Sequence, residues 1–359
     1  MSKKELTKQE LDNRIVDDRE FRKDLTSNSL AHFALFYFVH YLKLEPPDFH
    51  FTIYEDLQND EAGLFEIVGF RGSAKSTIAS LIYPLWSAIF KKRNFIVVCS
   101  DTYTQSKLAI ANIIYELENN QLLINDFGNF KGKDEEWTAS NFVMKNGVRI
   151  MTRSTGQKLR GIRHLAYRPD LIICDDIENI EDVRTIEQRN KNEEWFLSDV
   201  MPALDTQMGK LILIGNFLHS DSLMSRIKKK IVELGIGKYQ EYPLLNAKGE
   251  SVWIAAYPPE KIEELKKRNL RYFMREYLLQ IVSPDDQVVK RVSYYEKMPA
   301  AFSYIAIGVD LAISKKETAD YTAINILGEG EDGKMYNLKN IYGRWNFNET
   351  LDKINETFK

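Results

Sequence analysis

The stretch that decides the fold is "LFEIVGFRGSAKSTIASLIYPLW", residues 64–86. An apolar run, a turn with glycines and a second apolar run follow one another, which predicts a strand, a loop and a helix. The loop matches the phosphate-binding pattern G-x-x-x-x-G-K-[ST], except that Ala74 stands where the pattern has glycine. Such a loop points backbone N–H groups and the positive end of a helix at an anion. The stretch indicates a nucleotide site, and the alternative is an ordinary turn with a lysine facing solvent.

The residues of this loop have distinct predicted roles. Lys75 is expected to reach the terminal phosphates of ATP, and the Ser76 hydroxyl to bind Mg²⁺. Gly72 supplies the φ freedom that a tight loop needs. Ala74 is acceptable only if its backbone has ordinary helical angles, which its place beside the first helical turn favours. The predicted nucleotide-binding residues here are Gly69, Gly72, Ser73, Ala74, Lys75, Ser76 and Thr77.

A second motif, "PDLIICDDIEN", occupies residues 169–179. Its apolar part predicts a buried strand that ends at Asp175 and Asp176, and ligands of an open α/β sheet bind at that end of the strands. Asp175 is the expected metal-side carboxylate. Asp176 is the first candidate for activating the attacking water, and Glu178 is the alternative. A strand end capped by turn-forming aspartates is the other interpretation, which the presence of the loop makes weaker.

A third apolar run, "KLILIGN", residues 210–216, ends in Gly215 and Asn216. A polar side chain at this position would sense the γ-phosphate and pass its loss to neighbouring elements. A strand that ends in a plain turn explains the same pattern nearly as well. Strands and helices alternate from residue 64 to residue 216, which predicts the α/β class: a mostly parallel sheet of the P-loop NTPase type, with helices on both faces.

Composition places few limits on function. The 359 residues are 44% apolar and carry a net charge of −3, which gives no global sign of nucleic-acid binding. The two cysteines, Cys99 and Cys174, follow apolar runs and are expected to be buried thiols in a reducing compartment. The apolar stretch at residues 32–42 is too short to span a bilayer, so no membrane partner is expected.

Basic residues are concentrated in one segment, residues 145–168, which contains no acid. Such a strip could follow a phosphate backbone, or one arginine in it could stabilise charge on the transferring phosphoryl group. A solvated basic face is the alternative. The residues that we predict to contact DNA are Arg149, Arg153, Lys158 and Arg163.

In order and spacing, these motifs resemble the large terminase subunit of tailed bacteriophages, the motor that packages DNA into the prohead. "GFRGSAKST" resembles the family's loop, with Arg71 before Gly72 as a further nucleotide-binding residue. "STGQKLRGIRH" resembles the segment that carries the arginine finger, here Arg160. "LILIGNFLHSDSL" resembles the coupling segment. "FHFTIYEDL" takes the place of the adenine contact, which suggests Tyr54 and, with it, Phe51.

The later stretch "YIAIGVDLAISKKETADYTAINILG" resembles the start of the family's RNase H-like nuclease domain. The resemblance implies that Asp310 is its first metal-binding acid, with Asp320 as an auxiliary, for Mg²⁺ or Mn²⁺. The remaining acids should come from later strands, so we expect an incomplete, inactive nuclease. The expected organisation is a helical segment (1–60), an ATPase domain (61–283), a linker (284–303) and the incomplete nuclease domain (304–359).

The resemblance implies an ATP-driven motor that translocates double-stranded DNA in the cytoplasm of the infected host. Its implied partners are the portal protein, the small terminase subunit and further copies of itself in a ring on the portal. Two alternatives remain open: a helicase-like or other nucleic-acid-dependent ATPase, and a catalytically inactive scaffold that binds DNA or the portal.

Overall fold

The structure is a computed structural model that describes residues 14–59, 63–132, 136–281, 295, 297–312 and 321–358. The chain divides into two compact units, Met1–Ser283 and Pro284–Lys359. Among the residues described, every helix is too short or too polar to cross a membrane.

The first unit is built on an eight-stranded sheet with the strand order β3-β4-β5-β2-β6-β7-β1-β8. Its strands are β1 (Leu64–Gly69), β2 (Phe95–Ser100), β3 (Trp137–Thr138), β4 (Asn141–Val143), β5 (Arg149–Ser154), β6 (Leu171–Asp175), β7 (Lys210–Gly215) and β8 (Lys238–Tyr242). In this order, the neighbouring pairs from β5 to β8 are parallel. At the other edge, β4 pairs antiparallel with both β3 and β5. The prediction of a mostly parallel α/β sheet is confirmed.

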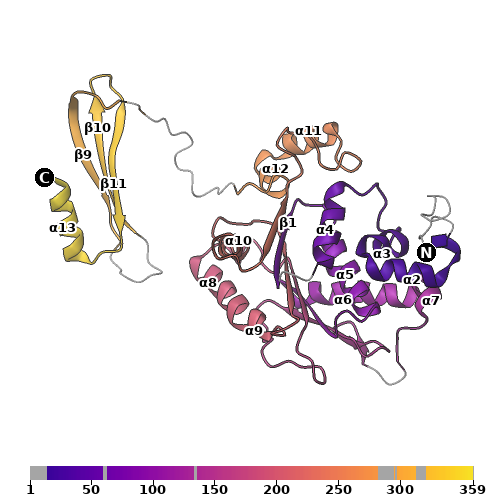
Figure 1. Ribbon diagram of the computed structural model, residues 1–359. Helices are drawn as coiled ribbons and strands as arrows, with labels where there is room; N and C mark the ends of the chain where they lie inside the picture. The colour runs from indigo at the N-terminus through magenta and orange to yellow at the C-terminus, as the bar shows by residue number, and fades with distance from the viewer. Residues whose placement is uncertain are drawn as a thin grey trace, which may run out of the picture. The chain divides into compact units, whose positions relative to one another are not determined.

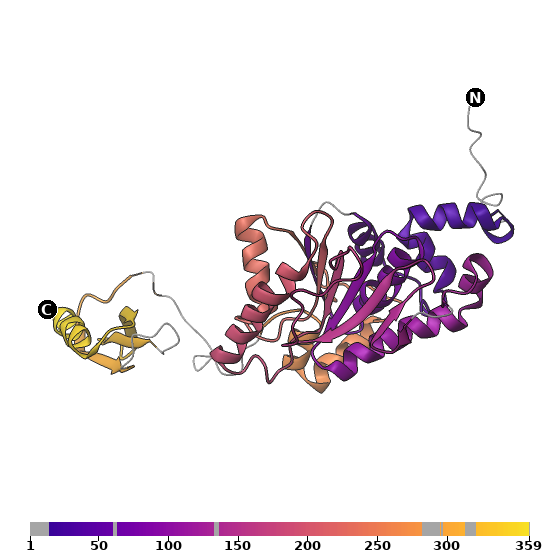
Figure 2. The same ribbon diagram turned by 90° about the horizontal axis from the view of Figure 1, so that it is seen from below.

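Helices cover both faces of this sheet (Figures 1 and 2). They are α2 (Arg19–Asn28), α3 (Leu30–Tyr37), α4 (Asp48–Gln58), the π-helix η1 (Thr77–Ile82), α5 (Tyr83–Ile89), α6 (Tyr103–Asn119), α7 (Gln121–Phe127), α8 (Ile186–Trp195), the π-helix η2 (Phe196–Val200), α9 (Met201–Ala203), α10 (Leu223–Leu234), α11 (Pro259–Arg268) and α12 (Leu270–Glu276). Figure 1 shows α4, α5 and α6 on one side of β1 and α8, α9 and α10 on the other. Every residue of β1, β2 and β7 is buried, so the core runs along the middle of the sheet.

The strand order positions the candidate site. β7 lies between β1 and β6, with Val68 opposite Gly215 and Asp175 opposite Ile214. Because all three strands are parallel, the segments that follow them emerge at the same edge of the sheet. The phosphate-loop motif, the paired aspartates and Asn216 are therefore brought together, although they are far apart in the sequence.

Two elements are not evident from local sequence patterns. The charged, helix-forming segment that contains α11 and α12 forms two helices and not one, because Asn269 leaves helical angles and its side chain accepts a hydrogen bond from Tyr272 N to begin α12. The sequence of β8 contains no apolar run. β8 is an edge strand and all its residues are half-buried, so it does not need one. Residues 145–147, with the sequence Lys-Asn-Gly, lie in the turn that joins the antiparallel strands β4 and β5, as this turn-forming sequence indicates.

The second unit contains a three-stranded antiparallel sheet with the order β11-β10-β9. Its elements are β9 (Phe302–Asp310), β10 (Thr322–Gly330), β11 (Met335–Gly343) and α13 (Phe347–Phe358). β10 and β11 form an antiparallel hairpin, and Gly333 occupies the left-handed region in its turn, with φ +72°.

Candidate nucleotide-binding site

The loop after β1 is tightly held at Gly72. This residue has φ +82°, and a Cβ added there would collide with the Tyr257 hydroxyl. The same hydroxyl donates a hydrogen bond of 3.0 Å to the carbonyl oxygen of Arg71. The loop thus needs glycine at position 72 for two reasons: its backbone angles, and the close approach of Tyr257 from the segment before α11.

Ala74 does not have ordinary helical angles, so the prediction made for it is wrong. Its φ is +63°, in the left-handed region. For a residue with a Cβ this conformation costs about 1–2 kcal/mol. Ala74 O accepts a hydrogen bond of 3.0 Å from Ile78 N in the first turn of the following helix, so the left-handed residue lies where the loop passes into the helix. The glycine of the usual pattern would adopt these angles without strain.

Lys75 is a largely buried lysine that makes no hydrogen bond or ion pair with the described residues, although its charge acts on the nearby Asp175. It is 8% exposed. The other deeply buried lysine, Lys210, behaves differently, since its ammonium donates to backbone carbonyls that include Leu57 O at 2.6 Å. Ser73 Oγ is also buried without a partner. No described acceptor occupies the ammonium of Lys75, so it is available to an anionic ligand bound in the loop.

Asp175 ends β6 and faces the helix that follows the loop. Its Oδ1 accepts a hydrogen bond of 2.9 Å from the Ser76 hydroxyl, and its Oδ2 one of 2.7 Å from the Ser80 hydroxyl. Burial, together with the neighbouring charge of Asp176, raises its pKa to about 6. A Mg²⁺–phosphate site requires a hydroxyl and a carboxylate at one point, and Ser76 and Asp175 meet this requirement.

The two candidates for the water-activating acid differ in their surroundings. Asp176 is exposed, has φ +46° and makes no side-chain hydrogen bond to any described residue. Glu178 is buried, and its carboxylate accepts hydrogen bonds from Leu223 N (3.0 Å) and Met224 N (3.4 Å) at the start of α10. Burial raises the pKa of Glu178. The carboxylate of Asp176 is free to meet a water, whereas that of Glu178 is occupied as a helix cap.

The end of β7 lies beside these acids. A Cβ added to Gly215 would lie 3.4 Å from Asp176 Oδ1. The side chain of Asn216 points the other way and donates a hydrogen bond of 3.2 Å to Glu276 Oε2. The predicted coupling residues therefore connect the acid side of the site to α12.

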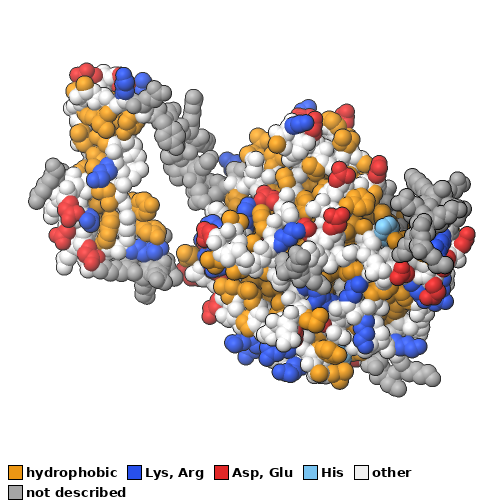
Figure 3. Space-filling view, in the orientation of Figure 1, with side chains coloured by type: hydrophobic (Ala, Val, Ile, Leu, Met, Phe, Trp, Pro, Cys, Tyr) orange, Lys and Arg blue, Asp and Glu red, His pale blue; other side chains and the backbone are white. Residues whose placement is uncertain are grey.

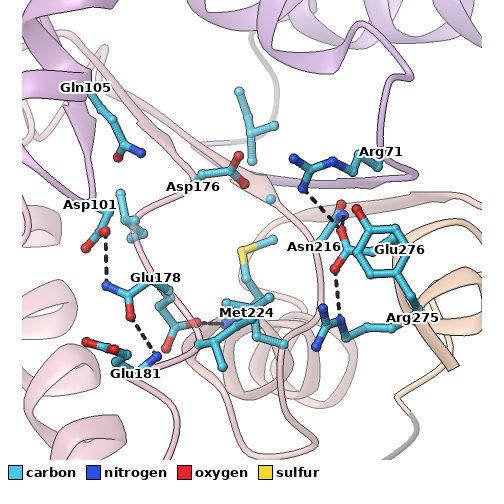
Figure 4. A pocket seen from close by; sticks show the side chains of 17 residues that line it. Arg71, Asp101, Gln105, Asp176, Glu178, Glu181, Asn216, Met224, Arg275 and Glu276 are labelled. Atoms are coloured by element: carbon cyan, nitrogen blue, oxygen red, sulfur yellow. Dashed lines mark hydrogen bonds and ion pairs between the residues drawn. The ribbon is translucent and has the colours of Figure 1, made fainter. Parts of the chain in front are cut away.

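A cavity of about 650 Å³ opens at this edge of the sheet. In Figure 4, Asp101, Glu178 and Glu181 lie on one side of it, and Arg71, Arg275 and Glu276 on the other. Its lining residues are Arg71, Asp101, Gln105, Asp176, Ile177, Glu178, Asn179, Ile180, Glu181, Ile214, Gly215, Asn216, Leu218, Met224, Tyr272, Arg275 and Glu276. The cavity is large enough for a small polar ligand and is lined by charges of both signs.

No cluster of three or more His, Cys, Asp or Glu side chains that could hold a metal ion is found in the described part of the chain. Mg²⁺ does not need such a cluster, because it commonly keeps waters and binds one or two protein oxygens together with substrate phosphates. Ser76 Oγ and Asp175 Oδ1 are two such oxygens, 2.9 Å apart. The residues present fit a Mg²⁺ ion that arrives with a nucleotide.

Tyr54, the suggested adenine contact, is buried and does not line the cavity. Phe51 lies on the same helix, α4, and is partly exposed. The contact from α4 to the loop is made by His50, whose Nε2 lies 2.8 Å from Ser73 O. Burial lowers the pKa of His50 to about 4, so its neutral ring donates this hydrogen bond. Helix α4 supports the loop through His50, a residue that the sequence did not single out.

Arg160, the predicted arginine finger, is exposed and does not line the cavity. It lies on the loop between β5 and β6, next to the buried Leu159. The loop is fixed on one side by Trp195, whose indole N–H donates a hydrogen bond of 2.8 Å to Gln157 O. The structure thus presents Arg160 to solvent, outside the lining of the cavity.

The four predicted DNA contacts fall into two groups. Lys158 and Arg163 are exposed on the loop after β5. Arg153 is half-buried, and Arg149 forms an ion pair of 2.9 Å with Glu136, which neutralises its charge locally. Figure 3 shows Lys and Arg side chains gathered along the lower edge of the first unit in that view.

The nuclease residues are described only in part. Asp310 is the last residue of β9, is exposed and pairs in register with Ala323. Asp320 lies outside the described residues.

Besides His50, the residues Ser80, Arg275 and Glu276 contribute to the site although the sequence did not indicate them. Ser80 carries a weak signal, since it lies four residues after Ser76 and so on the same side of the helix. Arg275 and Glu276 carry none, because a charged pair in a polar helix is ordinary. They reach the cavity only through the folding of α12 against the phosphate loop, where Glu276 O accepts a hydrogen bond of 2.8 Å from Arg71 N.

Comparisons with known proteins give matches only among solved structures. No model of a protein family matches the sequence, and no curated protein matches it significantly. The chain resembles phage large terminases in structure. The large terminase of bacteriophage HK97 matches with 16% identity and a TM-score of 0.47, over 86% of this chain and 65% of that one. The chain thus spans about two thirds of that terminase.

Two further structures match. A mutant of the ATPase domain of the Thermus phage P74-26 large terminase has 15% identity and a TM-score of 0.45, over 66% of this chain and 95% of that one. The large terminase of another thermophilic bacteriophage, in complex with ADP, has 11% identity and a TM-score of 0.40, over 83% of this chain and 69% of that one. Identities this low describe a likeness of fold.

Proposed function

We propose that this protein hydrolyses ATP and uses the energy to move double-stranded DNA. One observation carries the first part of this proposal: the buried, unpaired Lys75 lies on the loop whose Ser76 contacts Asp175. The loop geometry, the unpaired cation and the adjacent carboxylates are what a polyphosphate ligand requires. The DNA part is supported by the exposed basic residues of the loop after β5.

In the proposed reaction, a water attacks the γ-phosphorus of ATP and the bond to the bridging oxygen breaks, which leaves ADP and phosphate. Lys75 stabilises negative charge on the phosphates, and Asp176 orients the water and takes its proton. Mg²⁺, when bound by Ser76 and Asp175, supplies further neutralisation of phosphate charge. Asn216 would report the loss of the γ-phosphate to α12 through Glu276.

The arrangement outside the cavity suggests how copies cooperate. Arg160 faces solvent, so we propose that it completes the active site of a neighbouring copy in a ring. The ring would sit on the portal protein, receive DNA through the small terminase subunit and act in the host cytoplasm. The unit that contains Asp310 would be the nuclease, with Asp320 as a further acid and Mg²⁺ or Mn²⁺ as its metal.

Replacement of Lys75 tests the ATPase. We expect Lys75→Ala to abolish ATP turnover while the protein remains folded, and Lys248→Ala, a change at an exposed lysine, to leave turnover unchanged. Turnover should be measured with double-stranded DNA and over a range of protein concentrations, because an arginine from a neighbour requires assembly. Unaltered turnover in Lys75→Ala would contradict the proposed site.

A mixture of inactive variants tests the neighbour. Lys75→Ala and Arg160→Ala are each expected to be inactive, and a mixture of the two is expected to regain part of the activity. In a mixed ring, an intact phosphate loop can face an intact Arg160. An Arg160→Ala variant that turns over ATP by itself, or two inactive variants that recover no activity at any ratio, would contradict this role for Arg160.

A further inference from the structure

The carboxylate of Glu276 connects three separate parts of the cavity wall. It is buried at the end of α12. Its Oε1 accepts a hydrogen bond of 2.9 Å from Arg275 Nε, and its Oε2 one of 3.2 Å from Asn216 Nδ2. Arg71 NH1 lies 3.7 Å from the same Oε2. Figure 4 shows these four side chains converging on one side of the cavity.

Two guanidinium groups share this single carboxylate, so this side of the cavity carries a net positive charge, opposite the acids of the other side. Arg275 uses only its Nε for Glu276, and a guanidinium has four further N–H donors. The Arg71 side chain is 65% exposed, and its ion pair with Glu276 is long. Arg71 is exposed and weakly held, and Arg275 is partly exposed with free N–H donors. Such guanidinium groups are suited to bind phosphate oxygens, because arginine binds them in a planar, two-pronged manner.

We propose that Arg275 is a phosphate-binding residue that grips the terminal phosphate of ATP together with Arg71, and that Glu276 is the positioning residue that holds both arginines while no phosphate is present. This inference rests on the proposed ATPase function and names the second cation that the function uses. The incoming terminal phosphate competes with Glu276 for the two arginines. Glu276 is part of α12 and accepts the hydrogen bond of Asn216, so α12 and the end of β7 respond to the same event.

The proposal makes opposite predictions for the two residues. Removal of Arg275 removes charge-assisted hydrogen bonds to the γ-phosphate, a group that ADP lacks. We expect Arg275→Ala to weaken binding of ATPγS by about tenfold to a hundredfold, while the affinity for ADP stays within about threefold. Glu276→Gln keeps the shape but removes the competing charge, so we expect it to bind ATPγS at least about threefold more tightly and yet to turn over ATP more slowly.

The experiment measures the dissociation constants of ATPγS and ADP by calorimetry on the full chain, and ATP turnover in parallel. Arg271→Ala, at an exposed arginine of the same helix, is the matched control and should leave all three values unchanged. Thermal unfolding without nucleotide shows whether each variant is folded, and an unfolded Arg275→Ala would be replaced by Arg275→Lys, which should lose affinity for ATPγS only.

The possible outcomes distinguish a failure of this inference from a failure of the proposed ATPase function on which it rests. If the unmodified chain binds neither nucleotide, the proposed function fails. If the unmodified chain binds both nucleotides, the effect of Arg275→Ala decides. When that change alters both affinities equally, or alters neither, Arg275 does not bind the γ-phosphate and only this inference fails. Weaker ATPγS binding by Glu276→Gln would show that Glu276 supports the fold of the pocket and does not compete with phosphate.

Discussion

The hydroxyl of Ser80 donates a hydrogen bond of 2.7 Å to Oδ2 of Asp175, while Ser76 occupies the other carboxylate oxygen. Both serines lie at the start of the helix after the phosphate loop, so one carboxylate is fixed at both oxygens from one helix. Ser80 thus holds Asp175 in the orientation in which it faces Ser76.

We expect Ser80→Ala to lower ATP turnover by about tenfold, because a hydrogen bond to a charged group contributes about 1.5 kcal/mol. The Mg²⁺ concentration for half-maximal turnover should rise, since Asp175 is then less well oriented. Ser87→Ala, at a buried serine of α5, is the control. Equal effects of both changes on turnover and Mg²⁺ dependence would show that Ser80 acts only through stability.

The left-handed backbone at Ala74 predicts an unusual effect of glycine. Ala74→Gly relieves strain of about 1–2 kcal/mol and loses about 0.4–1 kcal/mol through the more flexible unfolded chain. The net expectation is a gain in the free energy of unfolding, measured by urea denaturation. Ala109→Gly within α6 should instead lose about 1 kcal/mol. A loss of stability in both variants would show that Ala74 is not strained in solution.

Glu66 of β1 predicts a pH dependence of stability. It is fully buried, neither carboxylate oxygen has a hydrogen-bond partner in the structure described, and burial raises its pKa to about 9 from 4.5. Between these values the folded state binds more protons at Glu66 than the unfolded state does. Stability therefore falls as the pH rises from 4.5 towards 9, by up to about 1.4 kcal/mol per pH unit.

Replacement with a neutral side chain of the same shape isolates this contribution. Glu66→Gln should be more stable than the unmodified protein at pH 8.5, and the difference should shrink towards pH 5. Urea denaturation at several pH values measures it, with the exposed Glu263→Gln as the control. A constant difference across this range would mean that Glu66 does not change its protonation on unfolding.

The loop and the paired aspartates were predictable because their signals are local. A strand, a glycine turn and a lysine in sequence fix the place of Lys75, and an apolar run fixes Asp175 at a strand end. The parallel arrangement then follows from the alternation of strands and helices. For these residues the structure adds the distances between the side chains to what the sequence already indicates.

The rest of the site depends on contacts that no local pattern records. Glu276 reaches the cavity because α12 packs against the loop, where Arg71 N donates to its carbonyl oxygen. The angles of Ala74 were predicted wrongly because the chain tolerates a strained residue where the loop must turn. β8 was missed because an edge strand need not be apolar.

The exposed basic residues of the loop after β5 predict a graded loss of DNA affinity. Lys158→Ala and Arg163→Ala should each weaken binding of double-stranded DNA and reduce the slope of log affinity against log salt by about 0.9. Arg149→Ala should change the slope less, because the charge of Arg149 is already neutralised by Glu136 at 2.9 Å. Fluorescence anisotropy with a labelled duplex, from low to moderate salt, measures both quantities.

Because a phosphate contact carries no sequence information, the losses should be equal for duplexes of different sequence. If removal of Lys158 and Arg163 together leaves the salt slope intact, DNA does not pass over this loop, and the surface that binds DNA must be sought elsewhere on the protein.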